Sequence, residues 1–339
     1  MVFKRCCSFL VRRRFIPVSH MPKVMIISIA CVFTASVFLL FSGYAEDIKS
    51  PFNSLTLSIN KNVGDHSFFV AGKIFGSVYD CSTSVFPAPS VIASIDIVNS
   101  SSVDFFVSLG DIYGRPSLLN IQNFNKSFAS KINMPFFNSP GNHEMENRAL
   151  YEYYYGKETY FDFIYGQEAF IFLDTDLDKG IEGEQLKYFQ RILHDYTKDP
   201  SIKNVFIFGH ELLWSAYNVN FQFIFSFLIT KRHYPLTSGN FKCEIEPYLI
   251  NLSQKGKDIY WFSGDGGGAF PCVFFYAKDP HHNIRYIATG IQDNINDAII
   301  KVNINKSGEV TMEPISLTGK KLLPIESYSL NYWENLINK

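Results

Sequence analysis

The sequence predicts an α/β fold, a two-sheet β-sandwich flanked by helices, with a transmembrane helix before it. Two observations lead to this prediction. Short apolar segments of strand length alternate with segments of helical periodicity in the first part of the globular region, and from residue 270 onward the pattern changes to strands alone. With 47% hydrophobic and 16% aromatic residues, the 339-residue chain has ample material for a buried core.

Apolar periodicity places the individual elements. Leu186, Phe189 and Ile192 lie at helical spacing and predict a surface helix over residues 184–196 that covers a sheet. The other expected helices are 91–99, 118–129 and one that ends at 151–155. The expected strands are the hairpin 160–165 and 169–173 and the segments 67–71, 103–109, 134–137, 205–208, 260–262, 270–277, 285–289, 298–304 and 309–314.

The N-terminal region has the composition of a membrane anchor. Residues 1–45 contain no Asp or Glu, and six basic residues precede the uncharged run 24–41, which is long enough to span a bilayer as a helix. Positive charge before the run, with Glu46 and Asp47 after it, predicts a cytoplasmic N-terminus and a periplasmic or extracellular domain. The alternative is a cleavable signal peptide ending at Gly43-Tyr44-Ala45, but the long basic and apolar segments favour a retained anchor.

These features divide the chain into five parts. They are a basic cytoplasmic segment (1–23), a transmembrane signal anchor (24–43), a linker (44–66), a globular domain (67–320) and a C-terminal tail (321–339). The anchor makes the membrane a partner of the protein. The formal net charge of -1 provides no field that would attract nucleic acid, so no nucleic-acid partner is expected.

Polar side chains follow four of the predicted strands directly. The four motifs are Gly110-Asp111, Gly141-Asn142-His143-Glu144, Gly209-His210 and Gly264-Asp265. Open α/β sheets bind their ligands outside the carboxyl ends of the strands, so we expect these side chains to converge on one site. Alone, Asp111 would be interpreted as a turn residue and His210 as a core histidine. The repeated arrangement indicates a site with metal-capable oxygen and nitrogen ligands instead.

The order Gly-Asp, Gly-Asn-His-Glu, Gly-His resembles the calcineurin-like metallophosphoesterases over residues 68–290. The resemblance implies a phosphate-ester substrate and a divalent metal cofactor. It further implies that Asp111 bridges two metals and that Asn142 and His210 bind the second of them. By the same resemblance, His143 contacts the phosphate and can act as an acid, and Glu144 holds His143 or its loop in position.

The two outer motifs depart from the family pattern. Where the family has Asp-x-His after its first strand, this chain has Ala71-Gly72-Lys73-Ile74-Phe75-Gly76, which contains neither a carboxylate nor an imidazole. Where the family ends in Gly-His-x-His, this chain has Gly264-Asp265-Gly266-Gly267. These losses fall mainly on the ligands of the first metal, so a two-metal mechanism is in doubt.

The remaining ligands form one complete set. Asp111, Asn142, His210 and Asp265 provide mixed oxygen and nitrogen atoms that suit one manganese, iron or zinc ion per chain. We expect Lys73 to supply a positive charge about where the missing ion would be, pairing with Asp111 or with the substrate phosphate. The alternative is a Lys73 that points to solvent, as a lone lysine usually does.

The function expected from the sequence is that of a membrane-anchored, extracytoplasmic, metal-dependent phosphoesterase acting on an unidentified phosphate ester. The alternative is a catalytically impaired relative that serves as a binding or assembly factor in envelope polysaccharide biosynthesis. A serine hydrolase fits poorly, because Ile112 rather than Ser follows Gly110-Asp111 and His rather than Asp follows Asn142. Metal content and activity on a chromogenic phosphodiester separate the first two.

Overall fold

The computed structural model describes residues 47–59, 63–76, 85–177, 180–215, 221, 240–267 and 274–338. All of these belong to the unit formed by residues 46–339. The segment 24–43, predicted to be a transmembrane anchor, lies outside the described residues. Within the described part of the chain, no helix has both the length and the apolar character needed to cross a bilayer.

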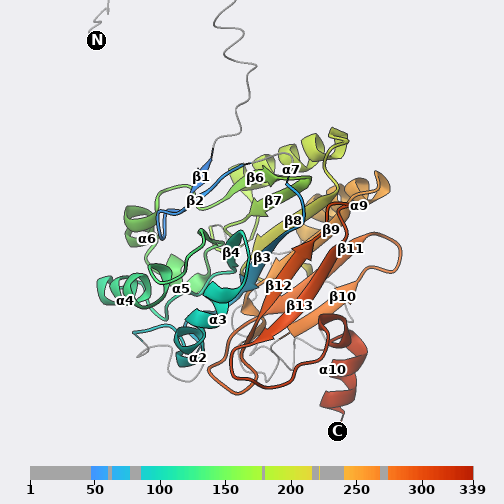
Figure 1. Ribbon diagram of the computed structural model, residues 1–339. Coiled ribbons are helices and arrows are strands. Elements are labelled where there is room, and N and C mark those ends of the chain that lie inside the picture. Colours follow the sequence, from blue (N-terminus) through green and yellow to red (C-terminus); the bar gives the residue numbers. More distant parts are fainter. Residues whose placement is uncertain are drawn as a thin grey trace, which may run out of the picture. The chain divides into compact units, whose positions relative to one another are not determined.

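One sheet has five strands in the order β13-β12-β3-β4-β5, of which β3, β4 and β5 run parallel (Figure 1). Every residue of these three strands is buried, as expected for parallel strands covered on both faces. The strands are β3 (His66–Ala71), β4 (Phe105–Ser108), β5 (Phe136–Asn138), β12 (Ala298–Ile304) and β13 (Val310–Ser316).

The other sheet has six strands in the order β10-β11-β9-β8-β7-β6. Its four central strands pair in parallel, and an antiparallel strand closes each edge. The strands are β6 (Phe161–Tyr165), β7 (Glu168–Phe172), β8 (Asn204–Gly209), β9 (Asp258–Ser263), β10 (Phe274–Lys278) and β11 (Ile284–Thr289). The predicted hairpin is therefore β6 and β7.

The two sheets pack face to face through aromatic side chains. Phe68 of β3 stacks on Phe105 of its own sheet, with ring centroids 5.1 Å apart, and meets Phe170 and Phe206 of the other sheet edge-on at 5.3 and 5.2 Å. The next residue, Phe69, points to the opposite face and packs under the helices, because side chains alternate along a strand. The predicted mixed α/β fold, with sheets and flanking helices, is confirmed.

Helices cover the outer faces of both sheets (Figure 1). Those on the five-stranded sheet are α2 (Pro89–Ala93), α3 (Ile95–Ser100), α4 (Leu118–Phe124), α5 (Asn142–Met145) and α6 (Arg148–Tyr155). Those on the six-stranded sheet are α7 (Gly183–Lys198) and α9 (Glu246–Gln254). The predicted helix 91–99 is divided at Ser94, whose hydroxyl donates to the carbonyl oxygens of Ser90 and Leu317.

Two segments expected to be a linker and a tail contain structure that packs on the domain. Residues 47–59 include the hairpin of β1 (Ile48–Lys49) and β2 (Thr56–Leu57), and Phe52 beside it stacks on Tyr155 with centroids 4.2 Å apart. In the tail, helix α10 (Leu330–Ile337) buries the side chain of Trp333. Both segments are polar on average, so their composition did not predict that single aromatic residues in them would bury large apolar areas.

The carboxyl ends of β3, β4, β5, β8 and β9 meet at one edge of the sandwich. Neighbouring parallel strands bring their ends together in register, as in the pairs Ala71 with Ser108 and Gly209 with Ser263. Between the layers, the hydroxyl of Ser139 lies 2.7 Å from the carbonyl oxygen of Phe208, so the end of β5 is joined to the end of β8. The polar residues that follow these strands are therefore placed side by side.

Candidate metal centre

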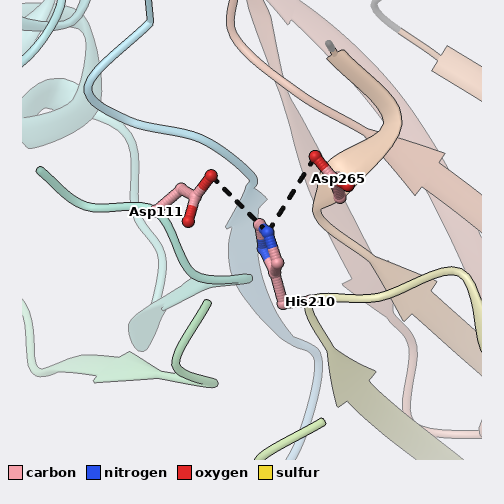
Figure 2. Close-up of side chains that lie close together, drawn as sticks. All are labelled: Asp111, His210 and Asp265. Carbon is pink, nitrogen blue, oxygen red and sulfur yellow. Dashed lines mark ion pairs between the residues drawn. The ribbon is translucent and has the colours of Figure 1, made fainter. Parts of the chain in front are cut away.

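Asp111, His210 and Asp265 converge at this edge, as Figure 2 shows. They come from the loops that follow β4, β8 and β9, and their potential ligand atoms all lie within 4.8 Å of one another. Asp111 and His210 are buried and Asp265 is partly exposed, so the cluster opens to solvent on the Asp265 side. Within the described residues, this is the group whose donor atoms lie close enough to hold a metal ion.

His210 presents one ring nitrogen to the cluster and uses the other to fix its orientation. Nδ1 lies 2.7 Å from the carbonyl oxygen of Leu109, and since a carbonyl can only accept, Nδ1 carries the proton. Nε2 lies 3.1 Å from Asn142 Oδ1, 3.5 Å from Asp111 Oδ2 and 3.9 Å from Asp265 Oδ1. Metal-binding histidines commonly donate their second N–H to a carbonyl in this way.

The charges around His210 favour a cation. Burial by itself lowers the pKa of the imidazole, but the carboxylates of Asp111 and Asp265 outweigh burial and raise it to about 9. In the metal-free protein the ring therefore takes up a proton at neutral pH. A metal ion at Nε2 would take the place of that proton.

Asp111 has the opposite balance. Burial favours its neutral form, but the positive charges of His210, His143 and Lys73 outweigh burial and lower the pKa of the carboxyl group. Its Oδ1 accepts from the backbone N–H of His143 at 3.2 Å. Its Oδ2 is buried and has no hydrogen-bond partner in the described part of the chain.

These residues fit a divalent metal. A buried carboxylate oxygen without a hydrogen bond requires a compensating positive charge, and Asp111 Oδ2 lies 3.5 Å from His210 Nε2, where a metal ion could replace the proton. Two carboxylates, an imidazole and the amide oxygen of Asn142 form a hard and borderline donor set that suits manganese, iron or zinc. The predicted ligands Asp111, Asn142, His210 and Asp265 are thus brought together.

Glu144 fixes the two loops that carry the centre. Its carboxylate is fully buried and accepts from the backbone N–H groups of Asp111 at 3.0 Å, Ile112 at 2.7 Å and Gly141 at 3.0 Å. Burial and the neighbouring Asp111 carboxylate raise the pKa of Glu144 to about 7, although the three donors stabilise its ionised form. At Gly110 a side chain would bring its Cβ to 2.5 Å from the Gly141 nitrogen, so the loops contact each other through backbone.

His143 stands beside the centre with one nitrogen free. Its Nδ1 lies 2.7 Å from the carbonyl oxygen of Gly114 and therefore carries a proton. Its Nε2 points toward Asp111 Oδ2 at 3.8 Å, and the ring packs against Phe75 with centroids 4.8 Å apart. The side chain is 17% exposed, so a substrate at the centre can reach Nε2.

Lys73 lies at the neighbouring strand end, two residues after the last residue of β3. The residue is 5% exposed, so the solvent-facing orientation is excluded. Its Nζ lies 5.3 Å from the centroid of the Phe75 ring. Within the described part of the chain, no carboxylate lies within 4.0 Å of the ammonium, so the expected close pair with Asp111 is not formed.

Sequence reasoning did not identify three further charged residues near the centre. Glu211 is buried, and its Oε2 has no hydrogen-bond partner among the described residues. Burial and the Asp265 carboxylate raise the pKa of Glu211 to about 8. Arg148 contacts the buried Asp174 at 2.6 Å. A carboxylate immediately after His210 was a signal for Glu211, but the Arg148 pair joins distant segments and left no sequence pattern.

A protein-family model described as calcineurin-like phosphoesterase matches residues 86–266, more than half of the chain. The chain belongs to the calcineurin-like phosphoesterase family. The matched region contains Asp111, Asn142, His143, His210 and Asp265 and begins after Lys73.

A purple acid phosphatase from yellow lupin (Lupinus luteus) seeds is similar in structure, with a TM-score of 0.48 and 10% sequence identity. The match covers 79% of this family member and 54% of the lupin chain, so the present chain spans about half the length of that protein. A search of curated proteins found no match.

Proposed function

We propose that this family member is a membrane-anchored, extracytoplasmic, metal-dependent phosphoesterase that hydrolyses a phosphate ester. The observation that supports metal-dependent hydrolysis is the convergence of Asp111, His210 and Asp265 at the strand-end edge, where the buried Asp111 Oδ2 has no hydrogen bond from any described residue. Such an arrangement holds a cation, and a cation beside an accessible imidazole is what phosphate-ester hydrolysis needs.

Each residue has a role that follows from its contacts. Asp111, Asn142, His210 and Asp265 would hold the metal. When bound, a divalent ion there supplies a Lewis acid that neutralises charge on the phosphate oxygens. The Nδ1–H of His210 donates to the carbonyl oxygen of Leu109, and this contact orients Nε2 toward the metal position.

His143 is placed to donate a proton to the leaving group. In hydrolysis, the water oxygen forms a bond to phosphorus and releases a proton to solvent, the ester P–O bond breaks, and the leaving oxygen takes a proton. Nε2 of His143 can donate that proton when the ring is protonated, because Nδ1 is held by the Gly114 carbonyl oxygen and Nε2 faces the centre. Glu144 keeps His143 and Asp111 in register by binding the backbone of both loops.

The location is proposed from the sequence. Six basic residues before the uncharged run 24–41, and acidic residues after it, support a retained anchor with the domain outside the cytoplasm. Protease added to intact cells or spheroplasts should degrade the domain. Protection from protease, or full release of the protein by a carbonate wash, would contradict this location.

The activity is tested with the full-length protein purified in detergent. The protein is loaded in turn with manganese, zinc and iron, and hydrolysis of a chromogenic phosphodiester and phosphomonoester is measured, with His210→Ala as the control for metal-dependent turnover. We expect the wild type to hydrolyse at least one ester. A chelator should abolish this activity, and His210→Ala should show none. Bound metal without hydrolysis of either ester would overturn the proposal and favour the alternative of a binding or assembly factor.

A further inference from the structure

The resemblance to the family implies a second cation beside Asp111, and the residues present do not fit one. We infer that the Lys73 ammonium replaces this second cation, so that the site holds one metal ion and binds the phosphate group of its substrate between that ion and Lys73. This inference rests on the proposed function and specifies how the same site recognises phosphate.

The strand end where the second cation would need ligands offers none. Ala71 is fully buried and packs into the core under the helices. Gly72 has no room for a side chain, because a Cβ there would lie 2.6 Å from the carbonyl oxygens of both Gly264 and Thr289. The loop after β3 is thus closed against the loop after β9 by backbone contact, and restoring a carboxylate would require the backbone to move.

The backbone holds Lys73 next to Asp111. The N–H of Lys73 donates to the carbonyl oxygen of Gly110 at 3.0 Å, and the N–H of Phe75 donates to the carbonyl oxygen of Asp111 at 3.2 Å. Lys73 and Asp111 both have left-handed backbone conformations, with φ of +55° and +57°. Side-chain-bearing residues rarely adopt this conformation, and it concentrates at functional sites, where the surrounding structure enforces it.

The side chain of Lys73 is buried, and no described carboxylate pairs with it. Lysine is almost never buried unless it is paired, yet Lys73 is 5% exposed and, within the described residues, has no carboxylate within 4.0 Å. Its Nζ lies over the same Phe75 ring that packs against His143, so one aromatic side chain positions both groups. The ammonium acts on the charge of Asp111 without contacting it.

This combination suits an anion that arrives with the substrate. An ammonium is a compact charge with three N–H donors and binds phosphate oxygens as a point charge. A phosphate group at the centre would be neutralised by the metal on one side and by Lys73 on the other. With a single positive charge, Lys73 replaces the electrostatic attraction of a cation but not its ability to coordinate ligands.

The test measures metal content and phosphate binding separately from turnover. Full-length protein in detergent is saturated with manganese, its metal content is determined by elemental analysis, and inorganic phosphate is titrated by calorimetry. We expect close to one ion per chain in wild type and in Lys73→Met, with phosphate affinity about tenfold or more weaker in Lys73→Met. Lys73→Arg, which keeps the charge, should recover part of the affinity.

The matched control is Lys257→Met. Lys257 is also 5% exposed, but it directly precedes β9, at the end of that strand away from the centre, and its ammonium donates to the backbone carbonyl oxygen of Ile202. Its loss should lower the thermal midpoint and leave phosphate affinity unchanged. Metal content of the wild type is measured without any variant, so the inference stays testable if Lys73→Met does not fold.

Three results would overturn the inference. They are two tightly bound ions per wild-type chain, no phosphate binding by the metal-loaded wild type, and equal phosphate affinity in wild type and folded Lys73→Met. Failure of the proposed function looks different. In that case metal and phosphate bind as expected, Lys73→Met weakens phosphate, and the wild type still hydrolyses no ester.

Discussion

The strand-end edge has two halves, both built from loops that follow parallel strands, and they differ in the side chains that they present. In the metal-binding half, formed by the loops after β4, β8 and β9, the side chains of Asp111, His210 and Asp265 direct metal-capable atoms toward one another. Asp111 and His210 each have a second contact that fixes the side chain. In the half formed after β3, Gly72 closes against the backbone of Gly264 and Lys73 provides the charge. If the first half holds the metal and Lys73 contacts the phosphate, as we infer, a Lys73 variant should weaken phosphate binding and leave metal content unchanged.

The largest effect is expected in the metal-binding half. Asp111→Ala removes a buried carboxylate whose Oδ2 lies 3.5 Å from His210 Nε2, so metal content should fall to near zero and kcat/KM by about a thousandfold or more. Asp111→Asn keeps the shape of the side chain but not its charge, so metal content and kcat/KM should fall nearly as far. Elemental analysis and kinetics check both variants, and a fully metal-loaded Asp111→Ala would break the comparison.

His143 lies between the two halves and should affect turnover alone. His143→Ala should lower kcat by about a hundredfold or more with metal content unchanged, because Nε2 is the group placed to protonate the leaving oxygen. His194→Ala on the exposed face of α7 is the control. Unchanged kcat in His143→Ala would remove the acid role from this residue.

Metal affinity and the stability of the metal-free protein should both depend on pH, in directions set by the pKa of His210. Its pKa is raised to about 9, so at pH 7 a metal must displace a proton, and apparent metal affinity should rise about tenfold per pH unit from pH 7 until it levels near pH 9. In the metal-free protein the same raised pKa contributes stability that is fully present below pH 6.5 and is lost as pH rises through 9. Metal titrations and thermal unfolding between pH 6 and 9 measure the two effects, and a metal affinity that does not change with pH would contradict the assignment of Nε2 as a ligand.

The smallest effect is expected from Glu144, which supports both loops. Glu144→Gln keeps one acceptor oxygen for three backbone N–H groups, and the loss of buried hydrogen bonds costs about 1–3 kcal/mol of unfolding free energy. Thermal denaturation should show a midpoint lower by several degrees. Glu146→Gln, exposed at the end of α5, should change nothing. Equal midpoints for both variants would show that Glu144 does not hold the loops.

The sequence predicts the metal-binding half better than the other half. Asp111, His210 and Asp265 could be identified because each follows an apolar strand directly, and neighbouring parallel strands place such residues together. The burial of Lys73 could not be predicted from the sequence, because it depends on contact with the Phe75 ring and on a left-handed backbone conformation. Neither feature can be inferred from composition. The aromatic contacts of Phe52 and Trp333 likewise depend on partners far along the chain.

The origin of the ligands has a mechanical consequence. Asp111 is carried by the five-stranded sheet, whereas His210 and Asp265 are carried by the six-stranded sheet, so one bound ion would tie the two layers of the sandwich together. Such a tie acts as a reversible cross-link that must open before the layers can separate. Metal loading should therefore slow unfolding as well as raise equilibrium stability, and loss of the ion in a metal-poor environment would leave the protein more easily degraded.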